Sequence, residues 1–238
     1  MSKIFRYECR RLLWNKFFIG LAVVLLLYGV FVLHAVTILG VAHTAPFSPW
    51  SFGDYLSRIM PLLWIGMLFF LTFFTSPNAR RAAVLTDAAP MPPKRYALAR
   101  CAAALTGGAL LTLLCMVEAA VFYGRMFHWY SWGSLLLPAL VTLLPALVFA
   151  LGSGWLAGQI RHWLVYVWMA VPFLLAALPL PKAFGLWNGS FFTVYPLTLE
   201  TLDPAFVLPV GVTVVQVVLL AAGTALLIFG SNRRRAVR

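Results

Sequence analysis

Residues 17–41 read FFIGLAVVLLLYGVFVLHAVTILGV, a stretch without a single Lys, Arg, Asp or Glu. A helix needs about 20 apolar residues to cross the hydrocarbon of a bilayer, so this stretch predicts a transmembrane helix. The whole chain has the same character, because 63% of its 238 residues are hydrophobic and 10% are charged. Soluble domains are about half apolar and about a quarter charged. The composition therefore excludes an ordinary soluble enzyme, a disordered chain and a disulfide scaffold.

Five further apolar segments follow the first, and each is near the length of a membrane span. With the first segment, the predicted spans are residues 17–41, 56–75, 98–123, 135–157, 163–180 and 206–230. The fourth and fifth segments contain two prolines each. We interpret these as kinks within helices, because neighbouring helices can satisfy the freed carbonyl groups. We therefore expect an all-α polytopic membrane protein with six transmembrane helices in a single domain, residues 1–238.

The basic residues predict the orientation of these spans. The formal net charge of +12 comes from 18 Lys and Arg against 6 Asp and Glu, and the charges are confined to short stretches around the apolar segments. If both termini are cytoplasmic, 15 of the 18 basic residues lie inside and only Arg58, Arg125 and Lys182 lie outside. Cytoplasmic loops of membrane proteins are enriched in Lys and Arg. This distribution predicts two cytoplasmic termini and explains the positive charge without a nucleic-acid partner.

The N-terminal residues 1–16 have the pattern of an amphipathic helix. Phe5, Leu12 and their apolar neighbours recur at helical spacing, whereas Arg6 and Arg10 fall towards the opposite face. Such a helix would lie along the inner membrane surface, with its apolar face in the lipid and its basic face towards anionic headgroups. The alternative is that this stretch is only a positively charged flank of the first span.

The cytoplasmic loop 76–97 follows the second span and has its own helix signals. Asn78 is a good helix cap, and residues 79–88 are mostly good helix formers. Pro90, Pro92 and Pro93 then end the helix, and the next helix leads into the third span. The pattern predicts a short helix across the inner membrane surface, although a merely charged loop remains the alternative.

The segment 181–205, between the fifth and sixth spans, combines aromatic residues with prolines and glycines. This composition is typical of short helices at the outer membrane interface, where aromatic rings are favoured. An ordinary aromatic belt explains it equally well.

No catalytic signature appears in the sequence. The chain has no zinc-protease motif, no Gly-x-Ser-x-Gly motif and no phosphate-binding loop of a P-loop ATPase. One acid, Glu118, lies within the third predicted span, where a charge usually faces the helix bundle or a wet cavity. Glu118 is therefore a candidate for a translocation path, or for a structural pair with Arg125, which lies two helical turns further on.

Two stretches carry a family resemblance. Near its N-terminus the chain reads Tyr7-Glu8-x-x-Arg11-Leu12. The loop from Arg80 to Arg100 contains a charged stretch, a Leu-Thr turn, prolines and a basic residue ahead of the third span. In these stretches and in its layout, the chain resembles the transmembrane subunits of ABC exporters of the type-2 permease class. The resemblance implies a coupling helix that contacts the ATPase, with the contact residues Arg80, Arg81, Val84, Leu85 and Asp87.

The resemblance also implies a function. The chain would be the permease subunit of an ATP-driven exporter in a bacterial plasma membrane, moving an amphipathic peptide, drug or lipid-like molecule outwards, for example for self-immunity. It would not be an enzyme and would hold no cofactor or metal itself, because ATP and Mg²⁺ would bind to separate ATPase subunits. Its partners would be those subunits, a second permease, identical or homologous, and membrane lipid. Two alternatives stay open: a non-transporting assembly or sensor subunit, and an intramembrane enzyme that uses Glu118.

Overall fold

The computed structural model describes residues 2–76, 79, 93–199 and 201–233. Within these ranges every regular element is a helix and none is a strand, which confirms the all-α prediction. The elements, in chain order, are α1 (Ser2–Leu13), α2 (Lys16–Ala35), η1 (Thr37–Leu39), α3 (Pro49–Thr75), α5 (Pro93–Phe127), α6 (Gly133–Ile160), α7 (His162–Ala177), η2 (Lys182–Phe184), α8 (Gly185–Asn188), α9 (Ser190–Val194), η3 (Pro196–Leu199) and α10 (Val210–Arg233).

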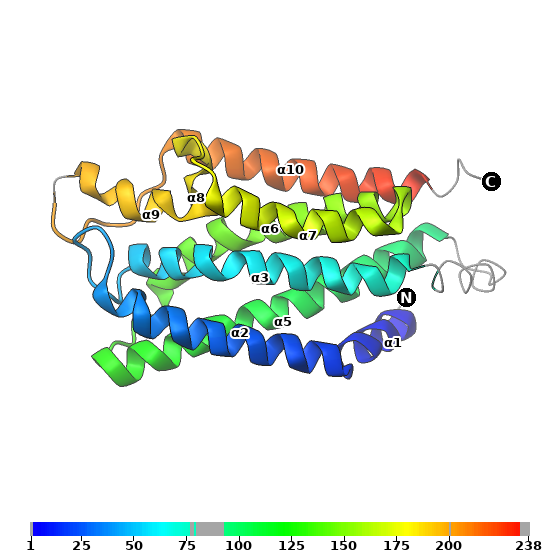
Figure 1. The fold of residues 1–238 in the computed structure, drawn as a ribbon, viewed down its shortest axis with the longest axis horizontal. Coiled ribbons are helices and arrows are strands. Elements are labelled where there is room, and N and C mark those ends of the chain that lie inside the picture. Colours follow the sequence, from blue (N-terminus) through cyan, green and yellow to red (C-terminus); the bar gives the residue numbers. More distant parts are fainter. Residues whose placement is uncertain (1, 77–78, 80–92, 200, 234–238) are drawn as a thin grey trace.

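The long helices form an elongated bundle in which α2, α3, α5, α6, α7 and α10 run along the length in alternating directions (Figure 1). As a result, α1, the end of α3, the start of α5 and the end of α10 all lie at one end of the bundle (Figure 1). We call this end the loop end. The opposite end, where α2 finishes and α3 begins, is called the far end. Both ends of the described chain therefore lie at the loop end.

Five described helices, α2, α3, α5, α6 and α10, are long and apolar enough to cross a membrane. Five helices of this length and composition indicate a multi-pass membrane protein. The helix that corresponds to the predicted span 163–180 is α7, which has only 16 residues. At 1.5 Å per residue it is about 24 Å long, shorter than the roughly 30 Å hydrocarbon core. Helices of spanning length are thus confirmed for five of the six predicted spans, and a crossing by α7, at the predicted span 163–180, stays a prediction.

The backbone at both ends of α7 explains its length. Arg161, which separates it from α6, is extended, with φ −146° and ψ 134°. Leu178 is extended as well and precedes Pro179, whose ring disfavours a helical conformation in the preceding residue. Pro179 thus ends α7, and our interpretation of it as a kink inside a helix was wrong. Three other prolines do lie within helices, as the sequence indicated: Pro138, Pro145 and Pro172.

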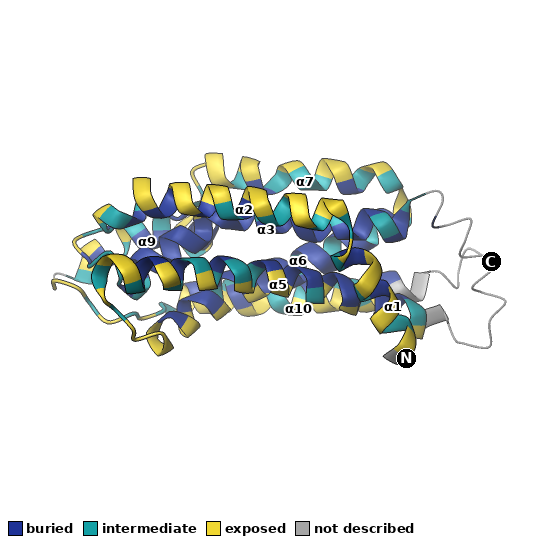
Figure 2. Ribbon diagram, turned by 90° about the horizontal axis from the view of Figure 1, so that it is seen from below, coloured by how far each residue is buried: buried dark blue, intermediate teal, exposed yellow. Residues whose placement is uncertain are grey.

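The core of the bundle is built around α3 and α6. Nearly all residues of α3 are buried, and this helix packs against α2, α5, α6 and α7, whereas α2 and α10 have large exposed faces (Figure 2). Glycines permit the close approach between the central helices. Gly154 of α6 faces Leu68 of α3, and Gly152 of α6 faces the backbone of Gly223 of α10. Small residues at such contacts let the helix backbones approach closely.

At the far end, the segment between α7 and α10 folds into short helices that cover the start of α3. Gly189 has a φ of 76°, which a residue with a side chain rarely adopts, and it lies against Asp54 and Ser57 of α3. Trp50 of α3 donates an indole hydrogen bond of 2.8 Å to the carbonyl oxygen of Pro204. The expected short helices are thus present, and they pack on the protein.

The contact between α6 and α10 gives the first prediction. A methyl group at residue 152 would overlap the carbonyl oxygen of Gly223, and this is backbone that cannot rotate away. We expect Gly152→Ala to lower the free energy of unfolding by about 1–3 kcal/mol, the usual cost of overpacking. Thermal unfolding of the purified protein in detergent measures this change in the free energy of unfolding. Gly211→Ala on α10 is the control, because that position has open space around it, and an equal loss in both variants would contradict this packing.

Candidate functional site

The candidate site lies at the loop end, where α1 crosses the base of the bundle and packs on α5 (Figure 1). The amphipathic pattern of α1 is confirmed: Leu12 is buried and Phe5 is half-buried against the core, whereas Arg6 and Arg10 are exposed. The apolar side of α1 therefore contacts protein, which corrects our expectation that it faces lipid. Its position at the membrane interface stays a prediction.

A buried ion pair joins α1 to α5. The guanidinium Nε of Arg100 donates to Glu8 Oε1 at 3.2 Å, and the two residues are only 3% and 1% exposed. Arg11, one turn further along α1, lies 3.7 Å from the other carboxylate oxygen of Glu8. Glu8 is thus held between two arginines, of which one is buried and one reaches solvent.

Two aromatic rings complete this cluster. The hydroxyl of Tyr96 donates to Glu8 Oε1 at 3.1 Å and accepts from Arg100 at 3.0 Å. The Arg100 guanidinium also lies 4.2 Å from the centre of the Tyr96 ring and 5.5 Å from the centre of the Phe74 ring. Contacts of this kind stabilise a desolvated cation. Burial raises the pKa of the thiol of the neighbouring Cys9. We call Glu8, Phe74, Tyr96 and Arg100 the anchor cluster.

The anchor cluster joins three segments that are far apart in the chain. Glu8 belongs to α1, Phe74 to the last turn of α3, and Tyr96 and Arg100 to the first turns of α5. The predicted coupling loop lies between Phe74 and Tyr96. The helix before the loop, the helix after it and the N-terminal helix therefore all meet at the guanidinium group of Arg100. Because a buried charge that loses its partner is strongly destabilising, the three segments are expected to move as one unit.

All five predicted coupling residues lie outside the described residues. These are Arg80, Arg81, Val84, Leu85 and Asp87. The described borders of the loop are Ser76 and Pro93, where α5 begins. The predicted short helix at residues 79–88 therefore stays a prediction, and the structure contributes only the position of its borders at the loop end.

Glu118 lies on α5, in the half of the bundle nearer the far end. Its carboxylate accepts a hydrogen bond of 3.3 Å from the hydroxyl of Tyr55, and it also lies against Gly29 of α2. The ion pairs found among the described residues do not include Glu118 with Arg125, which is exposed. Glu118 of α5 thus contacts Tyr55 of α3 and Gly29 of α2, and of its two predicted roles the structural pair with Arg125 is not formed. The role of Glu118 in a translocation path stays a prediction.

Sequence reasoning identified α1 and the loop but missed the anchor cluster. Glu8 was part of the quoted motif, and it is a lone acid among five basic residues of 3–16, which is a signal of a specific partner. Nothing in the sequence indicates that this partner is Arg100, 92 positions away. Among the described residues there is also no group of three or more His, Cys, Asp or Glu side chains that could hold a metal ion.

Comparisons of the chain with protein families, with curated proteins and with solved structures found no match.

The anchor cluster gives the second prediction. Arg100→Gln leaves Glu8 buried without its partner, so we expect the free energy of unfolding to fall by about 3–5 kcal/mol. Glu8→Gln/Arg100→Gln removes both charges and should recover a large part of this loss. Thermal unfolding in detergent, followed by tryptophan fluorescence, provides the measurement. Arg10→Gln on the exposed side of α1 is the control. If this control variant loses as much free energy of unfolding as Arg100→Gln, the Glu8–Arg100 pair has no specific structural role.

Proposed function

We propose that this chain is the permease subunit of an ATP-driven ABC exporter, as its sequence resemblance implies. The observation that carries the proposal is the anchor cluster, which joins the N-terminal helix to both borders of the loop 76–97 through one buried Arg100–Glu8 pair. A loop that only connects two spans needs no such fixation. A loop that is displaced by a partner protein needs to be fixed to the helices, because a displacement is transmitted only through rigid contacts.

The central position of α3 supports the same proposal. This helix leads from Phe74 in the anchor cluster through the middle of the bundle to Trp50 at the far end. It contacts α2, α5, α6 and α7 on the way. A movement of the loop would therefore reach four other long helices through α3. This is the mechanical property that a subunit needs if an event at the loop end is to open a path at the far end.

The far end supplies a matching contact. Trp50 is bonded to the backbone of Pro204, and its ring packs against Phe191, Tyr195 and Phe206. These residues belong to α9 and to the segments that flank it before α10. A displacement of α3 would thus also move the connection between α7 and α10, which is the segment that the resemblance places on the outer side.

In this proposal the loop end is cytoplasmic, because the exposed basic residues of α1 lie there together with Arg161 and the end of α10. Separate ATPase subunits bind the loop and hold ATP and Mg²⁺. A second permease subunit, identical or homologous, completes the transporter in the plasma membrane of a bacterium. The proposed cargo is an amphipathic molecule such as a peptide, a drug or a lipid. The α7 helix and the short helices that follow it would together complete the sixth crossing.

The third prediction tests the ATPase partner. The full chain is purified in mild detergent from its native membrane, and co-purifying proteins are quantified by mass spectrometry. We expect a P-loop ATPase in an amount equal to the chain, and its loss from Arg80→Glu/Arg81→Glu, because the reversed charges would repel the surface that the loop contacts.

Arg161→Glu is the matched control, since it reverses an exposed charge at the same end of the bundle without touching the loop. The ATPase should remain bound to this variant. An ATPase that stays with Arg80→Glu/Arg81→Glu would contradict the proposed contact. Absence of any ATPase from the wild-type preparation, while other membrane complexes stay intact, would contradict the exporter and favour an assembly or sensor subunit.

A further inference from the structure

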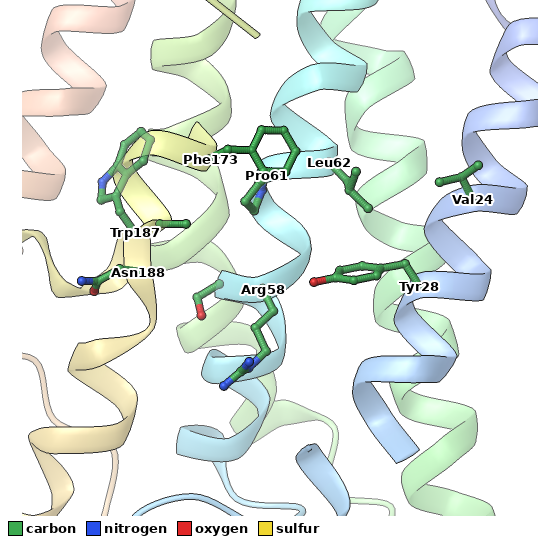
Figure 3. A pocket seen from close by; sticks show the side chains of 10 residues that line it. Val24, Tyr28, Arg58, Pro61, Leu62, Phe173, Trp187 and Asn188 are labelled. Carbon is green, nitrogen blue, oxygen red and sulfur yellow. The ribbon is translucent and has the colours of Figure 1, made fainter. Parts of the chain in front are cut away.

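A groove of about 510 Å³ runs along one side of α3 in the half of the bundle nearer the far end. Its volume lies within the roughly 300–1,000 Å³ of small-molecule sites. The floor of the groove is α3, one wall is α2, and the other wall is formed by α7 and α8. The residues that line it, most of them labelled in Figure 3, are Val24, Tyr28, Ser57, Arg58, Pro61, Leu62, Phe173, Ala176, Trp187 and Asn188.

The groove is apolar in one part and polar in the other. Val24, Leu62 and Phe173 lie on the side towards the middle of the bundle, whereas Arg58 and Tyr28 lie nearer the far end (Figure 3). Val24 and Phe173 are each about half exposed, so the apolar part opens outwards between α2 and α7. Around a membrane-spanning bundle, the medium outside this opening is lipid.

Arg58 has an unusual position on the otherwise enclosed helix α3. It is exposed, and its side chain is 41% accessible, whereas the rest of α3 is buried or half-buried. It lies nine residues after the start of α3 at Pro49, which is about 14 Å along the helix axis. It also lies 17 residues before the end of α3 at Thr75, which is about 26 Å. Measured from the loop end, Arg58 is therefore near the outer edge of a hydrocarbon core of about 30 Å, within reach of lipid headgroups.

Only part of the Arg58 guanidinium is engaged. Its Nε donates to Oδ2 of the buried Asp54 at 2.7 Å, one turn nearer the far end. Among the described residues it makes no second ion pair, and Figure 3 shows its guanidinium at the edge of the groove nearer the far end. Guanidinium groups bind phosphate through two parallel hydrogen bonds. The hydroxyl of Tyr28, on the facing wall, points towards α3 and can add a further donor (Figure 3).

We propose that this groove binds a lipid of the surrounding bilayer with an anionic headgroup. The phosphate lies at Arg58 and Tyr28, and one acyl chain lies along Val24, Leu62 and Phe173. The proposal does not depend on the exporter function, because it concerns the isolated chain and needs neither an ATPase nor ATP.

The charges of the chain favour a lipid over a second copy as the occupant. A second copy would have to place an acid opposite Arg58 within a span. The two acids inside the described long helices are Asp54, which is bonded to Arg58 of its own chain, and Glu118, which is held by Tyr55. The other acids lie outside the predicted spans. A lipid supplies both the anion and an apolar chain that matches the remaining wall.

The fourth prediction tests this site by photo-crosslinking. The full chain carries p-benzoylphenylalanine in place of Phe173, which lines the groove, or in place of Leu174, which is exposed next to it but does not line it. Each protein is placed in vesicles of equal parts phosphatidylglycerol and phosphatidylcholine, and mass spectrometry quantifies the two lipid adducts. We expect the ratio of anionic to zwitterionic adducts at 173 to exceed that at 174 by about fivefold, the effect of one basic side chain on an anionic lipid.

A second variant links this ratio to Arg58. Arg58→Gln alone would leave Asp54 buried without a partner, so the test uses Asp54→Asn/Arg58→Gln, which removes both charges together. In this background the ratio at 173 should fall to that at 174. Arg125→Gln is the control, because Arg125 is an exposed arginine outside the groove, and it should leave the ratio unchanged.

Three results would overturn the proposal. The first is an equal ratio at 173 and 174 in the wild-type background. The second is an excess at 173 that persists in Asp54→Asn/Arg58→Gln, because Arg58 would then not be the determinant. The third is the lack of any lipid adduct at 173 while 174 reacts normally, because protein rather than lipid would then cover the groove.

Discussion

The burial of α3 among its neighbours is the constraint on which the rest of this structure depends. A helix that is enclosed by α2, α5, α6 and α7 has to find apolar partners on almost every side. Glycines such as Gly154 let α6 approach closely enough to make those contacts. In a bilayer, helices associate through such close packing, because lipid is as apolar as their side chains. The outer helices α2 and α10 can therefore remain broadly exposed without weakening the core.

The same constraint decides where polar groups lie. A charge inside an apolar bundle has to be paired or aimed at water, since leaving it alone costs several kcal/mol. Three of the six acids of the chain follow this rule on different helix contacts: Glu8 pairs with Arg100, Asp54 with Arg58, and Glu118 accepts from Tyr55. Each of these acids thus satisfies a hydrogen-bond donor, and Glu8 and Glu118 also help to fix how the helices that carry the two side chains are placed.

The two proposed sites contact α3 at different places, and each contains an arginine with a different role. At the loop end, Arg100 of α5 is buried and contacts Glu8 of α1 and Phe74 of α3. Nearer the far end, Arg58 is half-open, so that part of its guanidinium remains available to a ligand. Exposure separates the two roles: an arginine without access holds helices together, whereas one that borders a groove can bind an anion. Since α3 connects them, a lipid at Arg58 would contact the helix that the proposed coupling moves.

The sequence alone determined the class of this protein, because apolar runs of span length and segregated basic residues follow directly from the solvent that a bilayer provides. It also determined the amphipathic character of α1, since helical periodicity is a local property. The tertiary structure decided which side chains meet. The Glu8–Arg100 pair spans 92 positions, and the groove at Arg58 is assembled from four helices. The end of α7 at Ala177 is different, because the effect of Pro179 on the backbone of Leu178 is local and could have been read from the sequence. Hydropathy reports how much apolar length is available, whereas contacts between distant segments depend on packing geometry, which no local pattern contains.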